Sequence, residues 1–123
     1  MTAPLRISFT LVLALMFASF ASLPTFAASN KKADEMAGAV LFRDKGCAHC
    51  HGEGGIGGKK GPPLVDIRKK KEWTPEKMTN QILNGGQKMP PFADSLTDAE
   101  VAQLVDYLRA KHRPVLPPAP PPA

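Results

Sequence analysis

The sequence is poor in the side chains with which a small domain usually stabilises its core. Its 123 residues include one tryptophan, one tyrosine and two cysteines, whereas 13 prolines and 10 glycines restrict regular secondary structure. Beyond residue 27, no apolar run approaches the roughly 20 residues of a membrane-spanning helix. No nucleophile and base stand at a spacing that indicates catalysis. We therefore predict that the protein is not an enzyme and has no membrane span beyond residue 27.

The N-terminus has the pattern of a secretory signal peptide. Arg6 precedes an apolar run at residues 7–20, and the small residues Thr25 and Ala27 suit a cleavage site. The run is shorter than a spanning helix, which argues against the alternative of a retained membrane anchor. We predict that residues 1–27 are cleaved, within a residue or two, and that the remaining chain is exported to the periplasm.

The exported part should form one small domain, residues 28–113, followed by a tail. Residues 114–123 contain six prolines and are predicted to be a disordered, extended, polyproline-like tail outside the domain. About 80 residues then remain to form a core, and a chain of this size buries only about 60 to 65 per cent of its unfolded surface. Such a domain often depends on a disulfide, a metal or a cofactor for its stability.

The chain is basic, with a formal net charge of +5, and four of its positive residues form one run at residues 68–71. A basic surface favours an acidic partner protein, because electrostatic attraction accelerates their encounter. No aromatic residues interleave with the run, so we do not expect a nucleic-acid partner. The alternative to a docking surface is a solvated lysine-rich loop.

Both cysteines lie in the stretch GCAHCHG, residues 46–52. Cys47 and Cys50 could form a disulfide, act in a redox motif or provide half of a zinc site. A zinc ribbon needs a second ligand pair, whereas the one histidine outside this stretch is His112. A redox motif belongs in a βαβ pattern, which the surrounding sequence lacks. Because His51 directly follows the second cysteine, the stretch has the Cys-x-x-Cys-His attachment signature of c-type haem.

The spacing of this motif suits covalent attachment of a porphyrin. Two thiols three positions apart at the end of a helix can each form a thioether with one vinyl group on the same porphyrin edge. His51 is then positioned to reach the iron from one side. The macrocycle would also supply apolar buried surface that so short a chain lacks. His49, between the cysteines, is expected to be a surface side chain.

A second axial ligand decides between electron transfer and ligand chemistry at a haem iron. Met89 stands 38 residues after His51, in the stretch NGGQKMPPF. The two glycines allow the backbone to approach the haem closely, and the two prolines stiffen the segment that presents the sulfur. Met36 and Met78 lie in helical patterns and are expected in the core, which is also the alternative for Met89.

These motifs resemble those of class I c-type cytochromes, which are small exported monohaem electron carriers. The likeness covers about residues 34–111 and rests on three segments in the family's order: CAHCH at 47–51, GPPL at 61–64 and MPPF at 89–92.

The resemblance implies a set of residue roles. Both cysteines would form thioethers to one haem c, and its iron would be bound by His51 and Met89. The carbonyl of Pro62 would accept the second N–H of the histidine ring, which orients the ring and strengthens it as a ligand. Trp73 is expected to cover the haem edge or to donate to a propionate; the alternative is a core tryptophan.

Local signals predict an all-α domain of about three helices, and the resemblance implies that they form a cytochrome c-like fold wrapped around the haem. Thr74 and Pro75 are typical of a helix start, and Thr97 and Glu100 form a capping-box pattern. The predicted helices span residues 34–45, 75–83 and 98–111.

Residue spacing predicts which helix faces are buried. The apolar face of the first helix should contain Met36, Val40 and Leu41. The buried face of the last helix should contain Val101, Leu104, Val105 and Leu108. The resemblance further implies that Gly38 and Phe42 pack against Tyr107. The glycine-rich residues 51–61 are expected to be flexible.

The expected function is that of a diffusible monomer carrying single electrons between periplasmic redox partners. Lys59, Lys60 and Lys88, near the haem edge, would guide docking onto acidic partner surfaces. Two alternatives stay open. One is a cytochrome subunit fixed to a dehydrogenase or terminal reductase complex through the Pro-rich tail. The other is a haem-based gas sensor or peroxidase in which Met89 leaves the iron.

Overall fold

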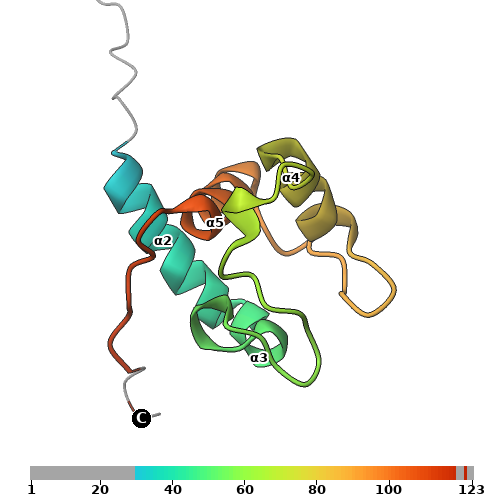
Figure 1. Cartoon of the computed structure of the whole chain (residues 1–123), viewed down its shortest axis with the longest axis horizontal. Coiled ribbons are helices and arrows are strands. Elements are labelled where there is room, and N and C mark those ends of the chain that lie inside the picture. Colours follow the sequence, from blue (N-terminus) through green and yellow to red (C-terminus); the bar gives the residue numbers. More distant parts are fainter. Residues whose placement is uncertain (1–29, 119–120, 122–123) are drawn as a thin grey trace, which may run out of the picture.

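The described part of the chain consists of helices joined by irregular segments (Figure 1). The computed structural model describes residues 30–118 and Pro121, so the predicted signal peptide and its cleavage after Ala27 lie outside the described residues. Within these ranges there is no strand, and none of the helices is long and apolar enough to cross a membrane. The α-helices are α2 (Lys31–Asp44), α3 (Cys47–His51), α4 (Pro75–Asn84) and α5 (Asp98–Arg109), and the 3-10 helices are η1 (Glu53–Gly55) and η2 (Ile67–Lys69). The predicted all-α class is confirmed.

Helices α4 and α5 begin where their capping residues predict. Thr74 Oγ1 accepts a hydrogen bond from the N–H of Lys77 at 3.3 Å, and Pro75 occupies the first turn of α4. In α5 the Glu100 N–H donates to Thr97 Oγ1 at 3.3 Å, while the Thr97 N–H donates to the Glu100 carboxylate at 2.8 Å. This capping box satisfies N–H groups that have no partner inside the helix, and so it determines where α5 starts.

The segment with the two cysteines forms a helix of its own, which the sequence did not predict as a separate element. Gly46 has a left-handed backbone, with φ of 82°, between α2 and α3. A residue in this conformation ends a helix, and glycine adopts it at little cost. The three predicted helices therefore correspond to α2, α4 and α5, with the five-residue α3 in addition.

α2 and α5 cross in close contact at Gly38. A Cβ atom on Gly38 would lie 2.0 Å from the carbonyl oxygen of Gln103 and 2.6 Å from Cβ of Tyr107, so only glycine fits here. The ring centroids of Phe42 and Tyr107 are 5.5 Å apart, and the two rings are tilted by 52°. The packing of Gly38 and Phe42 against Tyr107 is confirmed.

The inward face of α2 differs from the predicted one. Met36 is 42% exposed, and Val40 and Leu41 are only half-buried. The residues of α2 that are buried are Gly38, Ala39 and Phe42. The prediction was wrong for Met36, whereas Leu41 is partly buried against the core. The face shifts because the backbone of α5 approaches α2 at Gly38, which leaves Met36 in solvent.

The core is small and lies mainly between α2, α4 and α5. The predicted buried face of α5 is confirmed, and Met78 is buried as expected. The buried cluster comprises Ala39, Phe42, Ile67, Met78, Ile82, Leu96, Val101, Leu104, Val105, Tyr107 and Leu108.

The chain after α5 turns back and runs beside α2 (Figure 1). Residues 114–118 have no regular secondary structure, in keeping with an extended segment. Leu116 nevertheless packs against the core, while Val115 is 92% exposed. Part of the segment predicted to be a free tail therefore lies against the domain, although the boundary after residue 113 itself stays a prediction.

Candidate functional site

An apolar cavity of about 350 Å³ opens on the side of the domain that carries the end of α3 and the loop after α4. Its volume lies within the range of ligand pockets, and such pockets are mostly apolar with a few polar groups. The cavity is lined by His51, Pro62, Leu64, Ile67, Trp73, Met78, Gln81, Ile82, Gly86, Gln87, Lys88, Met89 and Leu108. Four residues singled out from the sequence, namely His51, Pro62, Trp73 and Met89, are thus brought together at one cavity.

His51 is the last residue of α3, and its ring orientation is set by a hydrogen bond. Its Nδ1 lies 2.9 Å from the carbonyl oxygen of Pro62. Because a carbonyl can only accept, Nδ1 carries the proton and donates, and in the neutral ring Nε2 then has the free lone pair. The side chain therefore presents the nitrogen that a metal can bind, and its partner is the one that the resemblance implied.

The glycine-rich segment after His51 is closed by backbone hydrogen bonds. The Gly57 N–H donates to the carbonyl of His51 at 2.6 Å, and the Gly58 N–H donates to the carbonyl of Gly61 at 3.1 Å. A Cβ on Gly58 would lie 2.6 Å from the carbonyl oxygen of Cys50. The absence of a side chain at Gly58 thus allows the loop to pack against the backbone of α3, whereas the expected flexibility of residues 51–61 stays a prediction.

Cys47 and Cys50 are free thiols, each partly exposed, on one short helix. Residues three apart lie on the same side of a helix, so both thiols are directed to the same neighbourhood. Cys47 packs against the core, and burial raises the pKa of its thiol. The described residues contain no group of three or more His, Cys, Asp or Glu that could hold a metal ion, so the zinc alternative finds no support among them.

Met89 is partly buried at the cavity, in a tight loop after α4. The Gly86 N–H donates to the carbonyl of Met89 at 2.8 Å. Gly85 has φ of 70°, and a Cβ there would lie 2.4 Å from the Met89 carbonyl oxygen, so this turn requires glycine. The Gln81 Nε2 donates to the Gly85 carbonyl at 2.9 Å and lies 4.0 Å from Met89 Sδ.

The cavity is therefore lined by one imidazole, the thioethers of Met78 and Met89, and apolar walls. Cys47 and Cys50 are not among its lining residues, although Cys50 directly precedes His51 in sequence. A haem with histidine and methionine as axial ligands needs one imidazole and one thioether. The residues present fit haem c.

Trp73 is half-buried in the cavity wall. Its backbone carbonyl accepts a hydrogen bond from Arg109 Nη1 at 3.0 Å, and Lys77 Nζ lies 4.7 Å from its ring centroid. The sequence did not predict that Arg109 and Lys77 contact Trp73, or that Gln81 lines the cavity. The sequence contained a signal for Gln81, because it lies between Met78 and Ile82 on the inward side of α4. A polar residue at such a position indicates a hydrogen-bond partner inside the domain.

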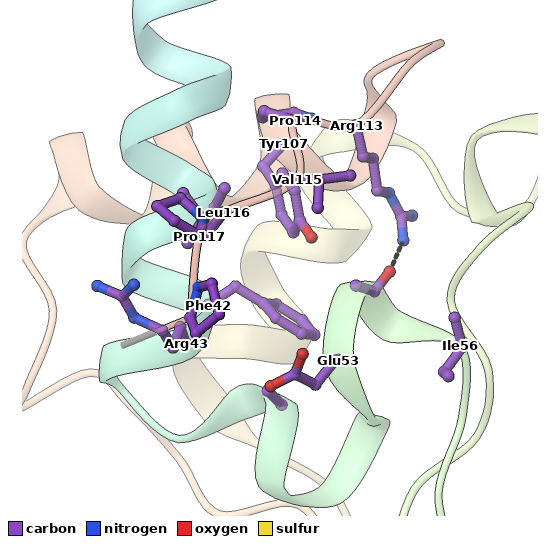
Figure 2. Close-up of a pocket in the computed structure, with 14 residues that line it drawn as sticks. Phe42, Arg43, Glu53, Ile56, Tyr107, Arg113, Pro114, Val115, Leu116 and Pro117 are labelled. Atoms are coloured by element: carbon purple, nitrogen blue, oxygen red, sulfur yellow. Dashed lines mark hydrogen bonds between the residues drawn. The ribbon is translucent and has the colours of Figure 1, made fainter. Parts of the chain in front are cut away.

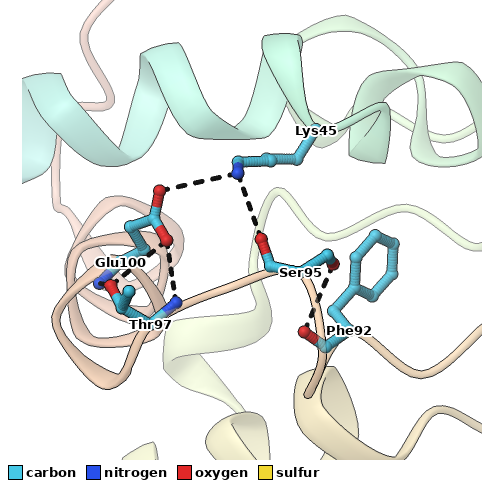
Figure 3. Close-up of polar contacts among 5 residues, drawn as sticks. All are labelled: Lys45, Phe92, Ser95, Thr97 and Glu100. Carbon is cyan, nitrogen blue, oxygen red and sulfur yellow. Dashed lines mark hydrogen bonds and ion pairs between the residues drawn. The ribbon is translucent and has the colours of Figure 1, made fainter.

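A polar network joins the end of α2 to the segment that follows Met89 (Figure 3). Lys45 Nζ donates to the carbonyl of Ser95 at 3.1 Å and lies 3.6 Å from Glu100 Oε1. The Ser95 hydroxyl in turn donates to the carbonyl of Phe92 at 3.3 Å. Lys45, two positions before Cys47, thus contacts both the start of α5 and the loop beyond Met89.

Comparisons with known proteins identify similar cytochrome c domains. Residues 33–108 match the family described as cytochrome C oxidase, cbb3-type, subunit III. The chain is 44% identical over 87 residues to quinohemoprotein alcohol dehydrogenase ADH-IIG from Pseudomonas putida, a match covering 67% of this chain and 11% of that protein. It is 34% identical over 86 residues to the cbb3-type cytochrome c oxidase subunit FixP from Sinorhizobium medicae, covering 58% and 28%.

Two further similarities point the same way. The menaquinol:cytochrome c reductase cytochrome c subunit of Bacillus subtilis is 31% identical over 71 residues, covering 58% of this chain and 26% of that protein. The solved structure of the KustC0563 c-type cytochrome aligns with a TM-score of 0.53 and 29% identity, covering 58% of this chain and 93% of that one. The chain spans less than a third of the three curated relatives.

The family match covers more than half of the chain and includes both cysteines and the residues around the cavity. The helical fold and the Cys-x-x-Cys-His motif agree with it. The chain belongs to the family of cytochrome c oxidase, cbb3-type, subunit III, and is a small c-type cytochrome that holds haem c and acts in electron transfer.

Proposed function

We propose that the protein carries single electrons between periplasmic redox partners, with His51 and Met89 as the two axial ligands of its haem iron. The observation that carries this proposal is that these two side chains, 38 residues apart in sequence, line one apolar cavity, and that His51 lies on the same short helix as Cys47 and Cys50. If protein side chains hold both axial positions, no position is open to a substrate, which favours electron transfer over catalysis.

The chain's own residues would perform four tasks. Cys47 and Cys50 would attach the cofactor through thioethers, and the Pro62 carbonyl, which accepts from Nδ1, would orient the His51 ring and leave Nε2 available as a metal ligand. Met89 supplies a soft thioether, which favours the reduced state, as do the apolar walls that exclude water. The haem supplies the one-electron Fe(II)/Fe(III) couple. Trp73 covers part of the cofactor from solvent.

Partner recognition would rest on the basic surface. Lys59, Lys60 and Lys88 are exposed, and Lys88 lines the cavity itself. We propose that they guide a monomeric protein onto acidic patches of its redox partners. Export to the periplasm after removal of residues 1–27 belongs to the same proposal.

Expression of the full chain in a host that matures c-type cytochromes tests the proposal. The purified protein should gain the mass of one haem, give a pyridine haemochrome spectrum and show the weak far-red methionine-to-iron band when oxidised. Met89→Ala should abolish this band, whereas Met36→Ala, at an exposed methionine, should retain it. A colourless protein, or a band that survives Met89→Ala, would contradict the ligand assignment.

A second candidate is a cytochrome subunit held in a larger enzyme complex. Two relatives are named as subunits of an oxidase and a reductase, and the third is a dehydrogenase of which this chain spans 11%. Size exclusion of native material separates the candidates, because a shuttle elutes as a small monomer and a subunit elutes with its complex. Carbon monoxide binding by the reduced protein at neutral pH would instead support a gas sensor or peroxidase.

A further inference from the structure

Arg113 lies four residues beyond the end of α5 and outside the family match. Its guanidinium donates to three backbone carbonyls: Nη1 to Gly54 at 2.8 Å, and Nη2 to Leu64 and to Leu108, the latter at 2.8 Å. It also lies 5.5 Å from the ring centroid of Tyr107. Figure 2 shows this side chain reaching from the C-terminal segment towards η1, at the edge of a second cavity of about 560 Å³ whose lining residues do not include His51 or Met89.

The three carbonyls come from three separate parts of the fold. Gly54 is in η1, Leu64 lines the haem cavity, and Leu108 is in the last turn of α5. Hydrogen bonds to these carbonyls stabilise the half-buried charge of Arg113, and the nearby Asp66 carboxylate adds electrostatic attraction. The planar fork of an arginine donates from two terminal nitrogens and can therefore reach acceptors that lie apart, whereas a lysine donates from a single nitrogen.

Leu64 is held from two sides. Its carbonyl accepts from Arg113, and its N–H donates to the carbonyl of Gly55 at 2.7 Å. Pro62 and Pro63 directly precede it, and their rings lock φ, which reduces the number of free torsions between Leu64 and the Pro62 carbonyl. That carbonyl is the acceptor of the His51 Nδ1–H.

We propose that Arg113 is a positioning residue for the His51 imidazole, acting through Leu64 and the two prolines. The inference rests on the proposed role of His51 as an axial ligand. We call the three hydrogen bonds from Arg113 to the carbonyls of Gly54, Leu64 and Leu108 the clamp. Without the clamp, the backbone of residues 54–64 becomes more mobile, and the hydrogen bond from His51 Nδ1 to the Pro62 carbonyl becomes weaker. The imidazole then becomes a weaker electron donor, which stabilises the oxidised iron less and raises the reduction potential.

The test compares Arg113→Lys with Arg43→Lys in the holoprotein. Arg43 lines the same second cavity but pairs with its neighbour Asp44 and, within the described residues, does not hydrogen-bond to Gly54, Leu64 or Leu108, so this control makes the same chemical change without touching the three carbonyls. Exchange of the His51 Nδ1–H with solvent, followed by NMR in the reduced protein, should become about fivefold or more faster in Arg113→Lys, as expected for loss of a hydrogen bond of ordinary strength. The reduction potential should rise in this variant and stay unchanged in the control. If Arg113→Lys lowers thermal stability but alters neither the exchange nor the potential, Arg113 is merely structural and the proposal fails.

Two further measurements test the proposal if the variant cannot be prepared and separate its failure from failure of the proposed function. If Arg113→Lys yields no holoprotein, the guanidinium protons of the unsubstituted protein are followed instead. Slow exchange of the Arg113 guanidinium protons with solvent, together with scalar coupling to the Leu64 carbonyl, supports the proposal. Exchange as fast as that of the Arg43 guanidinium protons overturns the proposal. Failure of the proposed function is seen separately, because the unsubstituted protein would then lack the haem or the methionine-to-iron band before any Arg113 variant is measured.

Discussion

The side-chain amide of Gln81 lies 4.0 Å from Met89 Sδ while it donates to the carbonyl of Gly85 at 2.9 Å. One side chain on α4 therefore contacts both the proposed ligand and the turn that presents it. The position of the sulfur depends on α4 as well as on its own loop.

Gln81→Leu should make Met89 easier to displace from the iron. Loss of the amide removes a hydrogen bond that contributes about 1 kcal/mol, so exogenous imidazole should bind the oxidised protein about fivefold more tightly. Spectrophotometric titration of the far-red band measures this. Asn80→Leu, on the exposed side of the same helix, provides the control and should leave the affinity unchanged.

Gly38→Ala should strongly destabilise the domain. The new methyl would lie 2.0 Å from the Gln103 carbonyl oxygen, so α2 and α5 would have to separate, at a cost of about 3 kcal/mol in the free energy of unfolding. Urea denaturation of the holoprotein measures the loss. Gly46→Ala has no atom within 4 Å of the added Cβ and should lose only about 1 to 2 kcal/mol from its left-handed backbone. Equal losses in the two variants would contradict the close crossing.

Glu100 should make stability fall in acid. Its pKa lies below the ordinary value, chiefly because the Thr97 N–H donates to its carboxylate, with further help from the Thr97 hydroxyl and Lys45. A lowered folded-state pKa stabilises the protein fully above the ordinary glutamate pKa of about 4.3, and this stabilisation is lost as pH falls through the folded-state pKa.

The measurement is the free energy of unfolding of Glu100→Gln and the unsubstituted protein as a function of pH. The variant should be less stable at neutral pH, and the two curves should converge in acid. Glu72→Gln, at an exposed position, serves as the matched control. A difference for Glu100→Gln that is the same at all pH values would rule out the carboxylate's charge as its cause.

Leu116→Ala should destabilise the domain although it lies in the Pro-rich segment. The side chain packs against the core, so its truncation should lower the free energy of unfolding by about 1 kcal/mol. Val115→Ala is the control, since Val115 is 92% exposed and should have no measurable effect. Identical thermal midpoints for both variants and the parent would mean that the segment is free in solution.

Features that depend on residues close in sequence could be predicted well. The capping box of Thr97 and Glu100 spans three residues, and the helix it starts was predicted with its buried face. The inward face of α2 could not be predicted in this way. Met36 is more hydrophobic than Gly38, yet Gly38 is buried because the backbone of α5 passes over it.

The sequence by itself determined the family, the attachment motif and the candidate ligands, because the chemistry of haem c demands particular residue types at short, fixed spacings. Only the tertiary structure decided that Gln81 contacts Met89, that Leu116 joins the core, and that Arg113 reaches carbonyls 49 and 59 residues earlier in the chain. Arginine can donate to any carbonyl, so its partners depend on how distant segments pack and carry no signal in local sequence.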